Sequence, residues 1–153
     1  MSETRDMTKV VFRVESEDGS CDVETPWATP VGDDLYRVEN SPFYAYEVSW
    51  LDIVRAPYSE EEERPLFSEV VEKSGHKTIR VIFDPPVEDG NESDAVLREL
   101  VEIGCTYEGA TRSYICIDIP PEIELSKVRK FLIDKEATFE HADPTYEQLF
   151  PEQ

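Results

Sequence analysis

The spacing of hydrophobic and polar positions along this chain changes near residue 77. Up to that point, short apolar runs alternate with turns that are rich in Gly, Pro, Asp and Asn. Short runs at regular intervals are typical of a small, strongly bent β-sheet or barrel. The first half of the chain, residues 1–77, is therefore predicted to be mainly β.

The strands of this half are predicted where β-branched and aromatic residues cluster between turns. A hairpin is expected where the turn at residues 32–34 leads into the apolar segment 35–38. The predicted strands are residues 9–14, 23–29, 35–38, 51–56 and 66–72.

After residue 77, two stretches repeat apolar side chains at helical spacing. Ser93 is the expected N-cap of the first helix, Asp94 lies in its first turn, and Gly104 ends it. The apolar stripes are Val96, Leu97, Leu100 and Val101 in the first helix, and Leu125, Val128, Phe131 and Leu132 in the second.

Strands are predicted on either side of these helices, at residues 78–83, 105–108, 114–119 and 138–142. The resulting order is that of the ferredoxin-like βαββαβ arrangement, in which both helices cover one face of a four-stranded antiparallel sheet. The predicted fold class is thus α+β. A small β-sheet or barrel-like half, residues 1–77, precedes a ferredoxin-like half, residues 78–153, and the two are expected to pack as one compact unit.

The net charge of the chain indicates more about its partners than its hydrophobic content does. The 153 residues hold 35 Asp and Glu against 15 Lys and Arg, which gives a formal net charge of −20. A magnitude of roughly 2–8 is enough to keep a small domain soluble. The excess repels nucleic acid and anionic membranes and attracts basic proteins. With no membrane-length apolar run and no signal-peptide core, a cytoplasmic protein is expected.

Short motifs in the first 83 residues resemble one bacterial family. They are Glu24, Trp27-Ala28, Gly32-Asp33, Tyr36-Arg37-Val38, Asn40-Ser41-Pro42-Phe43, Val48-Ser49, Asp52-Ile53-Val54 and Val70-Val71-Glu72-Lys73-Ser74-Gly75-His76-Lys77-Thr78-Ile79-Arg80-Val81. Their order is similar to that of the family known as domain of unknown function 4265. The resemblance implies a small bacterial cytoplasmic protein, and it brings no activity and no catalytic residues with it.

The expected partner-binding surface combines acidic clusters with aromatic side chains, because aromatics ringed by acids make good interface anchors. The candidate residues are Glu60, Glu61, Glu62, Glu63, Asp84, Glu88, Asp89, Glu92, Tyr44, Tyr46 and Trp50. For any single cluster, a solvated surface loop is the simpler interpretation. The sum of the clusters is what indicates a cationic partner. The acidic loop at residues 84–94 lacks the ligand spacing of a calcium loop.

Histidines and cysteines offer weaker candidates for chemistry. His76 is either a catalytic base or, more simply, a histidine held in a turn. If the hairpin turn centres on residues 110–111, Cys105 faces Cys116 as two reduced thiols or as a redox switch. His141 is expected on the far side of the sheet from that hairpin. No metal site, cofactor or catalytic residue is therefore predicted.

The leading functional hypothesis is an immunity-type inhibitor, a monomer or weak dimer that occludes the active site of a basic toxin, one that acts on nucleic acid. The alternative is a ferredoxin-like regulatory module that dimerises and binds a small molecule. An enzyme ranks third because the chain lacks a phosphate-binding glycine loop and a nucleophile elbow. Direct binding to nucleic acid or to a membrane is the least favoured interpretation, since the basic residues are scattered among the acids.

Overall fold

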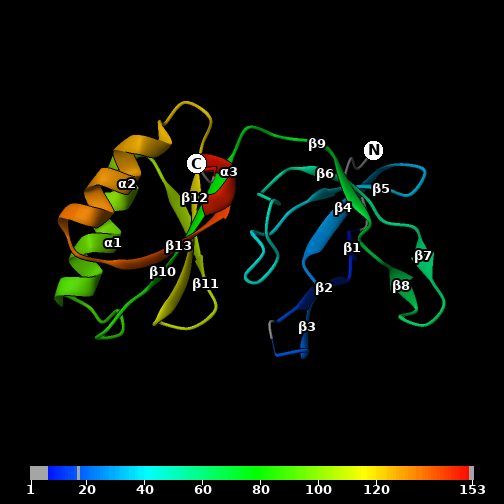
Figure 1. Cartoon of the computed structure of the whole chain (residues 1–153), viewed down its shortest axis with the longest axis horizontal. Helices are drawn as coiled ribbons and strands as arrows, with labels where there is room; N and C mark the ends of the chain where they lie inside the picture. Colours follow the sequence, from blue (N-terminus) through cyan, green and yellow to red (C-terminus); the bar gives the residue numbers. More distant parts are fainter. Residues whose placement is uncertain (1–6, 17, 152–153) are drawn as a thin grey trace, which may run out of the picture. The chain divides into compact units, whose positions relative to one another are not determined.

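The computed structural model describes residues 7–16 and 18–151 and divides the chain into two compact units, residues 1–74 and 75–153 (Figure 1). The sequence-based boundary lay three residues later, between 77 and 78. The molecule is a mixed α+β protein, built mostly of strands in several antiparallel sheets, with few helices. Each unit has a hydrophobic core of its own.

The N-terminal unit is centred on a five-stranded antiparallel sheet. Its strands, in spatial order, are β1 (Thr8–Lys9), β4 (Trp27–Gly32), β5 (Leu35–Val38), β6 (Ile53–Arg55) and β9 (Glu69–Glu72). Two separate hairpins accompany it, β2 (Phe12–Glu15) with β3 (Cys21–Glu24) and β7 (Tyr58–Ser59) with β8 (Arg64–Pro65). Across the described residues β1 and β9 are the sheet's two edges, so this is an open sheet rather than a barrel.

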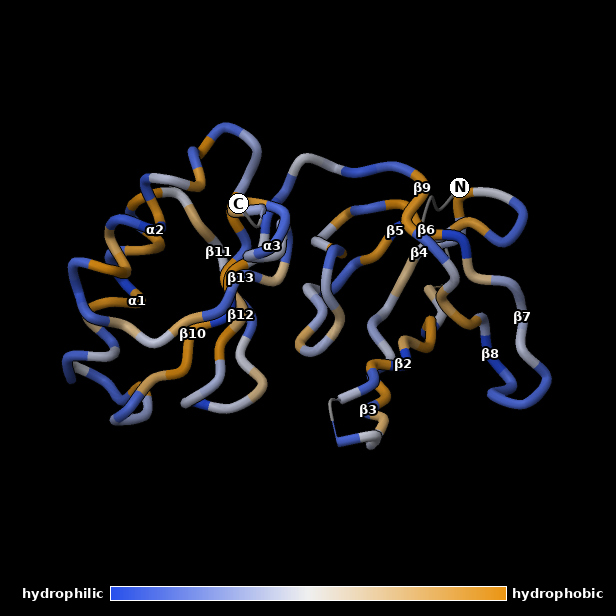
Figure 2. The backbone as a smooth tube through the Cα atoms, in the orientation of Figure 1, coloured by the Kyte–Doolittle hydropathy of each residue, from blue (hydrophilic) through white to orange (hydrophobic). Residues whose placement is uncertain are grey.

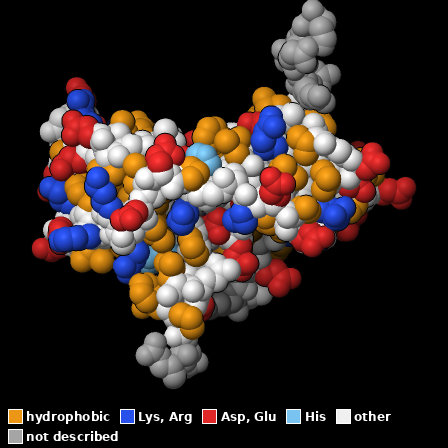
Figure 3. Space-filling view, turned by 90° about the horizontal axis from the view of Figure 1, so that it is seen from above, with side chains coloured by type: hydrophobic (Ala, Val, Ile, Leu, Met, Phe, Trp, Pro, Cys, Tyr) orange, Lys and Arg blue, Asp and Glu red, His pale blue; other side chains and the backbone are white. Residues whose placement is uncertain are grey.

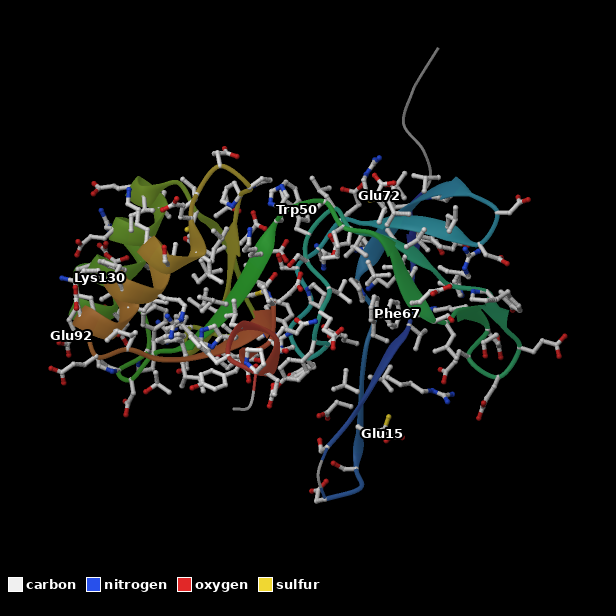
Figure 4. All side chains as sticks on the ribbon, turned by 45° about the horizontal axis from the view of Figure 1, so that its top comes forward. Glu15, Trp50, Phe67, Glu72, Glu92 and Lys130 are labelled. Carbon is white, nitrogen blue, oxygen red and sulfur yellow. The ribbon has the colours of Figure 1, made fainter. Side chains whose placement is uncertain are left out.

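Two of the strands expected in this unit are broken or shortened. The strand predicted over 23–29 is two strands, β3 and β4, with Pro26 between them. Proline has no N–H to donate to a strand ladder, so Pro26 interrupts pairing. The strand predicted over 66–72 is reduced to β9, and Leu66 forms only an isolated bridge with Val11. The core beneath these strands includes Phe12, which stacks on Phe67 with ring centroids 4.5 Å apart (Figure 4).

The C-terminal unit follows the expected order of strand, helix, strand, strand, helix, strand. Its antiparallel sheet has the order β11-β12-β10-β13. The elements are β10 (Lys77–Ile82), α1 (Glu92–Ile103), β11 (Thr106–Gly109), β12 (Tyr114–Ile119), α2 (Leu125–Asp134), β13 (Thr138–Asp143) and the short α3 (Tyr146–Leu149). Both long helices lie against the same face of this sheet (Figure 1).

The helix-facing side of that sheet carries the larger core. Alternate residues of β10 and β12 point to it, because successive strand side chains face opposite sides. These buried residues are Ile79, Val81, Ile115, Ile117 and Ile119, and they pack with Leu97, Leu100, Val128 and Leu132 of the helices. The predicted helical stripes therefore supply core residues, although Val101 is 47 % exposed at the edge of the first one.

Two local predictions in this unit are wrong. The N-cap of α1 is Asn91, whose side chain accepts from the N–H of Asp94, while the Ser93 hydroxyl donates to the Pro85 carbonyl. Cys116 lies opposite Glu108 rather than opposite Cys105, because the hairpin turn is centred further along the chain. Both cysteines are buried, and neither forms a disulfide. Over the described residues, no helix is long and apolar enough to cross a membrane.

Candidate functional site

A row of polar side chains lies on the second face of the C-terminal sheet, opposite the helices. Thr78, Arg80, Cys116 and Asp118 alternate with the core isoleucines and valine of β10 and β12, and all four are buried. Charged side chains are seldom fully buried unless they are paired. Their partners therefore define what this face can do.

Asp118 is the centre of the best-defined polar cluster on this face. Its side chain is 4 % exposed, and both carboxylate oxygens lie 3.0 Å from Nδ1 of His76. The hydroxyl of Thr106, on the neighbouring strand, donates to Oδ2 at 3.3 Å. Burial raises the pKa of Asp118 above its ordinary value, while the charge and hydrogen bond of His76 oppose that shift.

A His–Asp pair is the arrangement that orients a general base in many hydrolases. Here the Thr106 hydroxyl is bonded to the carboxylate rather than activated by the imidazole. Burial, with a smaller effect of Asp118, raises the pKa of the Cys105 thiol to about 11, so that thiol is protonated and weakly nucleophilic at neutral pH. Through these contacts Asp118 holds the His76 side chain in place just before β10, which is a structural role.

Asp52 forms a second buried carboxylate cluster, in the N-terminal unit. It accepts from the N–H groups of Ser49 at 2.8 Å and Ser74 at 2.7 Å, and from Nζ of Lys73 at 2.6 Å. Lys73 also donates to the Glu47 carbonyl at 3.0 Å. One fully buried acid thus fixes the last residues of this unit.

Glu24, which is only partly buried, forms a third carboxylate cluster and positions one of the predicted aromatic residues. Its carboxylate accepts from three consecutive N–H groups, those of residues 43, 44 and 45, at 2.7–2.9 Å. Tyr44 and Tyr46 are 42 % and 47 % exposed, as an interface anchor requires. Trp50 is only partly exposed, and its Nε1 donates to the Glu39 carbonyl at 3.2 Å (Figure 4).

The predicted run of four glutamates forms the turn of the β7–β8 hairpin. Arg13 of β2 pairs with Glu62 and, at 3.3 Å, with Glu61. Within the described residues, Glu60 and Glu63 make no ion pair. Figure 2 shows this hairpin tip and the loop before α1 as strongly hydrophilic.

The predicted acids of the loop before α1 divide into two groups. Glu88 and Asp89 pair with Arg112 at 3.9 Å and Arg98 at 3.3 Å. Asp84 and Glu92, by contrast, line an open pocket of about 450 Å³ at the start of α1.

The predicted partner-binding residues are divided between the two units. Tyr44, Tyr46, Trp50 and Glu60–Glu63 belong to the N-terminal unit, and Asp84, Glu88, Asp89 and Glu92 belong to the C-terminal unit. Within the first unit, the segment after β5 and the β7–β8 hairpin lie at opposite edges (Figure 1). We find no group of His, Cys, Asp and Glu able to hold a metal ion in residues 7–16 and 18–151.

Sequence reasoning missed Asp118, Asp52 and Glu24 as organising residues. The available signal was an acidic residue inside or beside an apolar strand, where a solvated surface does not explain it. The family model described as "Domain of unknown function (DUF4265)" matches residues 24–141 and includes all three. The chain belongs to the DUF4265 family. The resemblance drawn from the sequence motifs is therefore confirmed.

Comparison with other proteins finds a shared fold for this DUF4265 protein and indicates no activity. No curated protein matches it. It is similar to the chain in "Novel crystal structure of a hypothetical protein from Neisseria gonorrhoeae", with a TM-score of 0.77 and 15 % sequence identity. The match covers 94 % of this chain and 99 % of that one. At this identity the likeness shows a shared fold alone.

Proposed function

We propose that this DUF4265 protein is an acidic immunity-type protein of the bacterial cytoplasm. It binds a basic toxin, most simply one that acts on nucleic acid, and neutralises it by occluding the active site. The observation that carries the proposal is the excess of surface carboxylates that have no cation of their own. This function needs no catalysis by the protein itself.

The acid excess is present in both units. Residues 1–74 hold 18 Asp and Glu against 7 Lys and Arg, and residues 75–153 hold 17 against 8. In the described part of the chain, the buried acids are Asp52, Asp118 and Asp143, so nearly all of this charge faces solvent. Acidic side chains are spread over both units in the view of Figure 3.

Within residues 7–16 and 18–151, nine of the cations pair with acids of the protein itself. Those in ion pairs are Arg13, Arg37, Arg55, Lys73, Arg80, Arg98, Arg112, Lys130 and Lys135. The remaining carboxylates repel one another and favour a partner that brings positive charge. A nuclease or another nucleic-acid-binding toxin has a basic cleft for its substrate. Carboxylates of the inhibitor would occupy that cleft in place of the substrate's phosphates.

Electrostatic attraction of this kind acts chiefly on the rate of association. Steered complexes associate at roughly 10⁸–10⁹ M⁻¹s⁻¹ at low salt, and the rate falls steeply as salt rises. A fast inhibitor is what a cell needs against a toxin that arrives already folded and active.

The test begins with the full chain immobilised and exposed, at low salt, to lysate of the source cell. A basic protein that elutes as salt rises is then purified, and its activity is assayed with and without the DUF4265 protein. We expect stoichiometric inhibition, with an association rate that falls at least about tenfold between low and physiological salt. Binding without inhibition, or a rate that does not depend on salt, would contradict the proposal.

Two matched double variants test whether the carboxylates of the β7–β8 hairpin contact the toxin. Glu60→Gln with Glu63→Gln removes two carboxylates that have no ion pair among the described residues. Glu61→Gln with Glu62→Gln removes the same formal charge from two carboxylates that share an ion pair with Arg13. If the hairpin meets the toxin, the first pair slows association more than the second.

The alternative is a regulatory module, and the strand order of the C-terminal unit favours it. We infer that this unit is a ferredoxin-like domain, because an antiparallel βαββαβ sheet with the order β11-β12-β10-β13 is the arrangement of that fold. Its edge strands, β11 and β13, are available for pairing between copies. A stable dimer in sedimentation velocity, with no basic protein captured, would favour this function over the first.

A further inference from the structure

An open pocket of about 450 Å³ lies at one end of the C-terminal unit. Three segments that are distant in sequence form it: the end of β10 at residues 82–84, the first turns of α1, and the connection from α2 into β13 at residues 135–138. These segments meet in Figure 1, and Figure 4 labels Glu92 beside that connection. The pairing of Ile82 with Thr138 fixes the spacing between two of them.

Part of the pocket lining is apolar. Ile82, at the end of β10, is 52 % exposed, and Val96 and Ala137 also line the pocket. Phe83, another lining residue, is buried and belongs to the main core. An exposed isoleucine in such a hollow leaves apolar surface in water, and a hydrocarbon chain placed over it would release that water.

Acidic residues also line the pocket, and most of their charge is uncompensated by the cation of the lining; we call these acids the rim. Lys135 is the cation of the lining, and its Nζ lies 3.3 Å from Oε2 of Glu99, which neutralises it. Asp84, Glu92 and Glu136 also line the pocket, and none of them makes an ion pair within residues 7–16 and 18–151.

We propose that this pocket receives the side chain of an arginine or lysine from the partner of the protein. The inference rests on the function proposed above and names the contact through which it works. Arginine and lysine combine an aliphatic stem with a charged head. The stem covers Ile82, Val96 and Ala137, and the head reaches the carboxylates of Asp84, Glu92 and Glu136.

Other occupants fit the pocket less well. A neutral apolar side chain would take the rim carboxylates out of water without a counter-charge, which is costly. An anion would add to the repulsion among the same carboxylates. Charge and hydrophobic surface together therefore select a long cationic side chain.

The first test uses a defined probe, the blocked tripeptide acetyl-Gly-Arg-Gly-amide, titrated into the ¹⁵N-labelled full chain by NMR. Its neutral, nearly isosteric control contains citrulline in place of arginine. We expect saturable shifts confined to residues 82–84, 92–99 and 135–138, and binding of the citrulline peptide weaker by about tenfold. Shifts spread evenly over the acidic surface, or equal binding of the two peptides, would overturn the proposal.

The second test uses charge-matched variants of exposed residues. Glu92→Gln with Glu136→Gln removes two rim carboxylates, and Glu122→Gln with Glu124→Gln removes the same charge elsewhere on the same unit. The rim pair is expected to weaken the peptide about tenfold and the control pair less than about threefold. Equal losses in the two pairs would reduce the effect to net charge and refute a specific pocket.

The captured partner separates the two proposals. If the toxin is inhibited and the rim variant inhibits it as well as the control variant does, the pocket inference fails while the proposed function stands. If the arginine peptide binds at the pocket but no basic protein is captured or inhibited, the proposed function fails and the pocket remains a site for a cationic side chain.

Discussion

The buried carboxylate of Asp118 lowers the free energy of unfolding of a protein that already carries a large negative charge. Its burial raises its pKa above the ordinary value of 3.8, and His76 offsets only part of that effect. An acid with a raised folded pKa holds its proton more tightly in the native state than in the unfolded chain. Its contribution to the free energy of unfolding therefore falls as pH rises from about 3.8 through the folded pKa.

Asp118→Asn removes this contribution and keeps an oxygen that accepts from Nδ1–H of His76. We expect the free energy of unfolding of the native protein, relative to that of the variant, to decrease as pH rises above about 4, because the pKa of Asp118 is raised in the folded state. Urea titrations followed by circular dichroism at several pH values measure the difference. The exposed Asp33→Asn serves as control for loss of charge alone. Parallel pH curves for the native protein and Asp118→Asn would contradict the assignment.

At the scale of the element, the start of α1 depends on a single side chain. Asn91 accepts from the N–H groups of Asp94 and, at 3.2 Å, Glu88, and its own amide donates to the Pro86 carbonyl at 2.8 Å. Asn91→Ala removes all three bonds, and loss of a helix cap typically costs about 1 kcal/mol. Chemical denaturation should show this loss. Ser126→Ala, at an exposed position in the first turn of α2, is expected to stay within about 0.5 kcal/mol of the native protein.

Element type could be predicted from the sequence in the C-terminal unit because its helices have clear apolar stripes and its strands alternate. Details that depend on neighbours could not. Ser93 and Asn91 are both good N-cap residues, and the choice between them depends on where the loop at residues 85–86 places its carbonyls. Cys105 and Cys116 do not face each other because the hairpin turn is centred further along the chain than residues 110–111, where it was expected.

The candidate sites likewise divide into features that are local in sequence and features that depend on tertiary contacts. The acidic side chains are easy to find in the sequence, since surface charge needs no tertiary information. The internal carboxylates are not, because the contact of His76 with Asp118 spans 42 residues and depends on the register of β10 against β12. The pocket beside Glu92 likewise requires three segments that only the folded sheet brings together.

At the scale of the whole molecule, the net charge of −20 makes the folded state sensitive to ionic strength. Compaction brings like charges together, and dissolved ions screen them with a Debye length of about 30 Å at 0.01 M and 8 Å at 0.15 M. We expect the thermal midpoint to rise as NaCl increases across this range at neutral pH. Differential scanning calorimetry measures it. A variant with Glu60–Glu63 changed to Gln should respond less steeply, whereas a midpoint that falls with salt would show that the internal ion pairs dominate.

The cluster around Asp52 has a consequence for the life of the protein in a cell. Boundaries between compact units are where proteases usually cut first, because the chain there is exposed and easily extended. Lys73 is a cleavage residue for trypsin-like enzymes, yet its ammonium group and the next backbone N–H are both held by the same buried carboxylate. A protease would have to break those bonds before it could bind the chain at Lys73, so we expect this boundary to resist cleavage between the units.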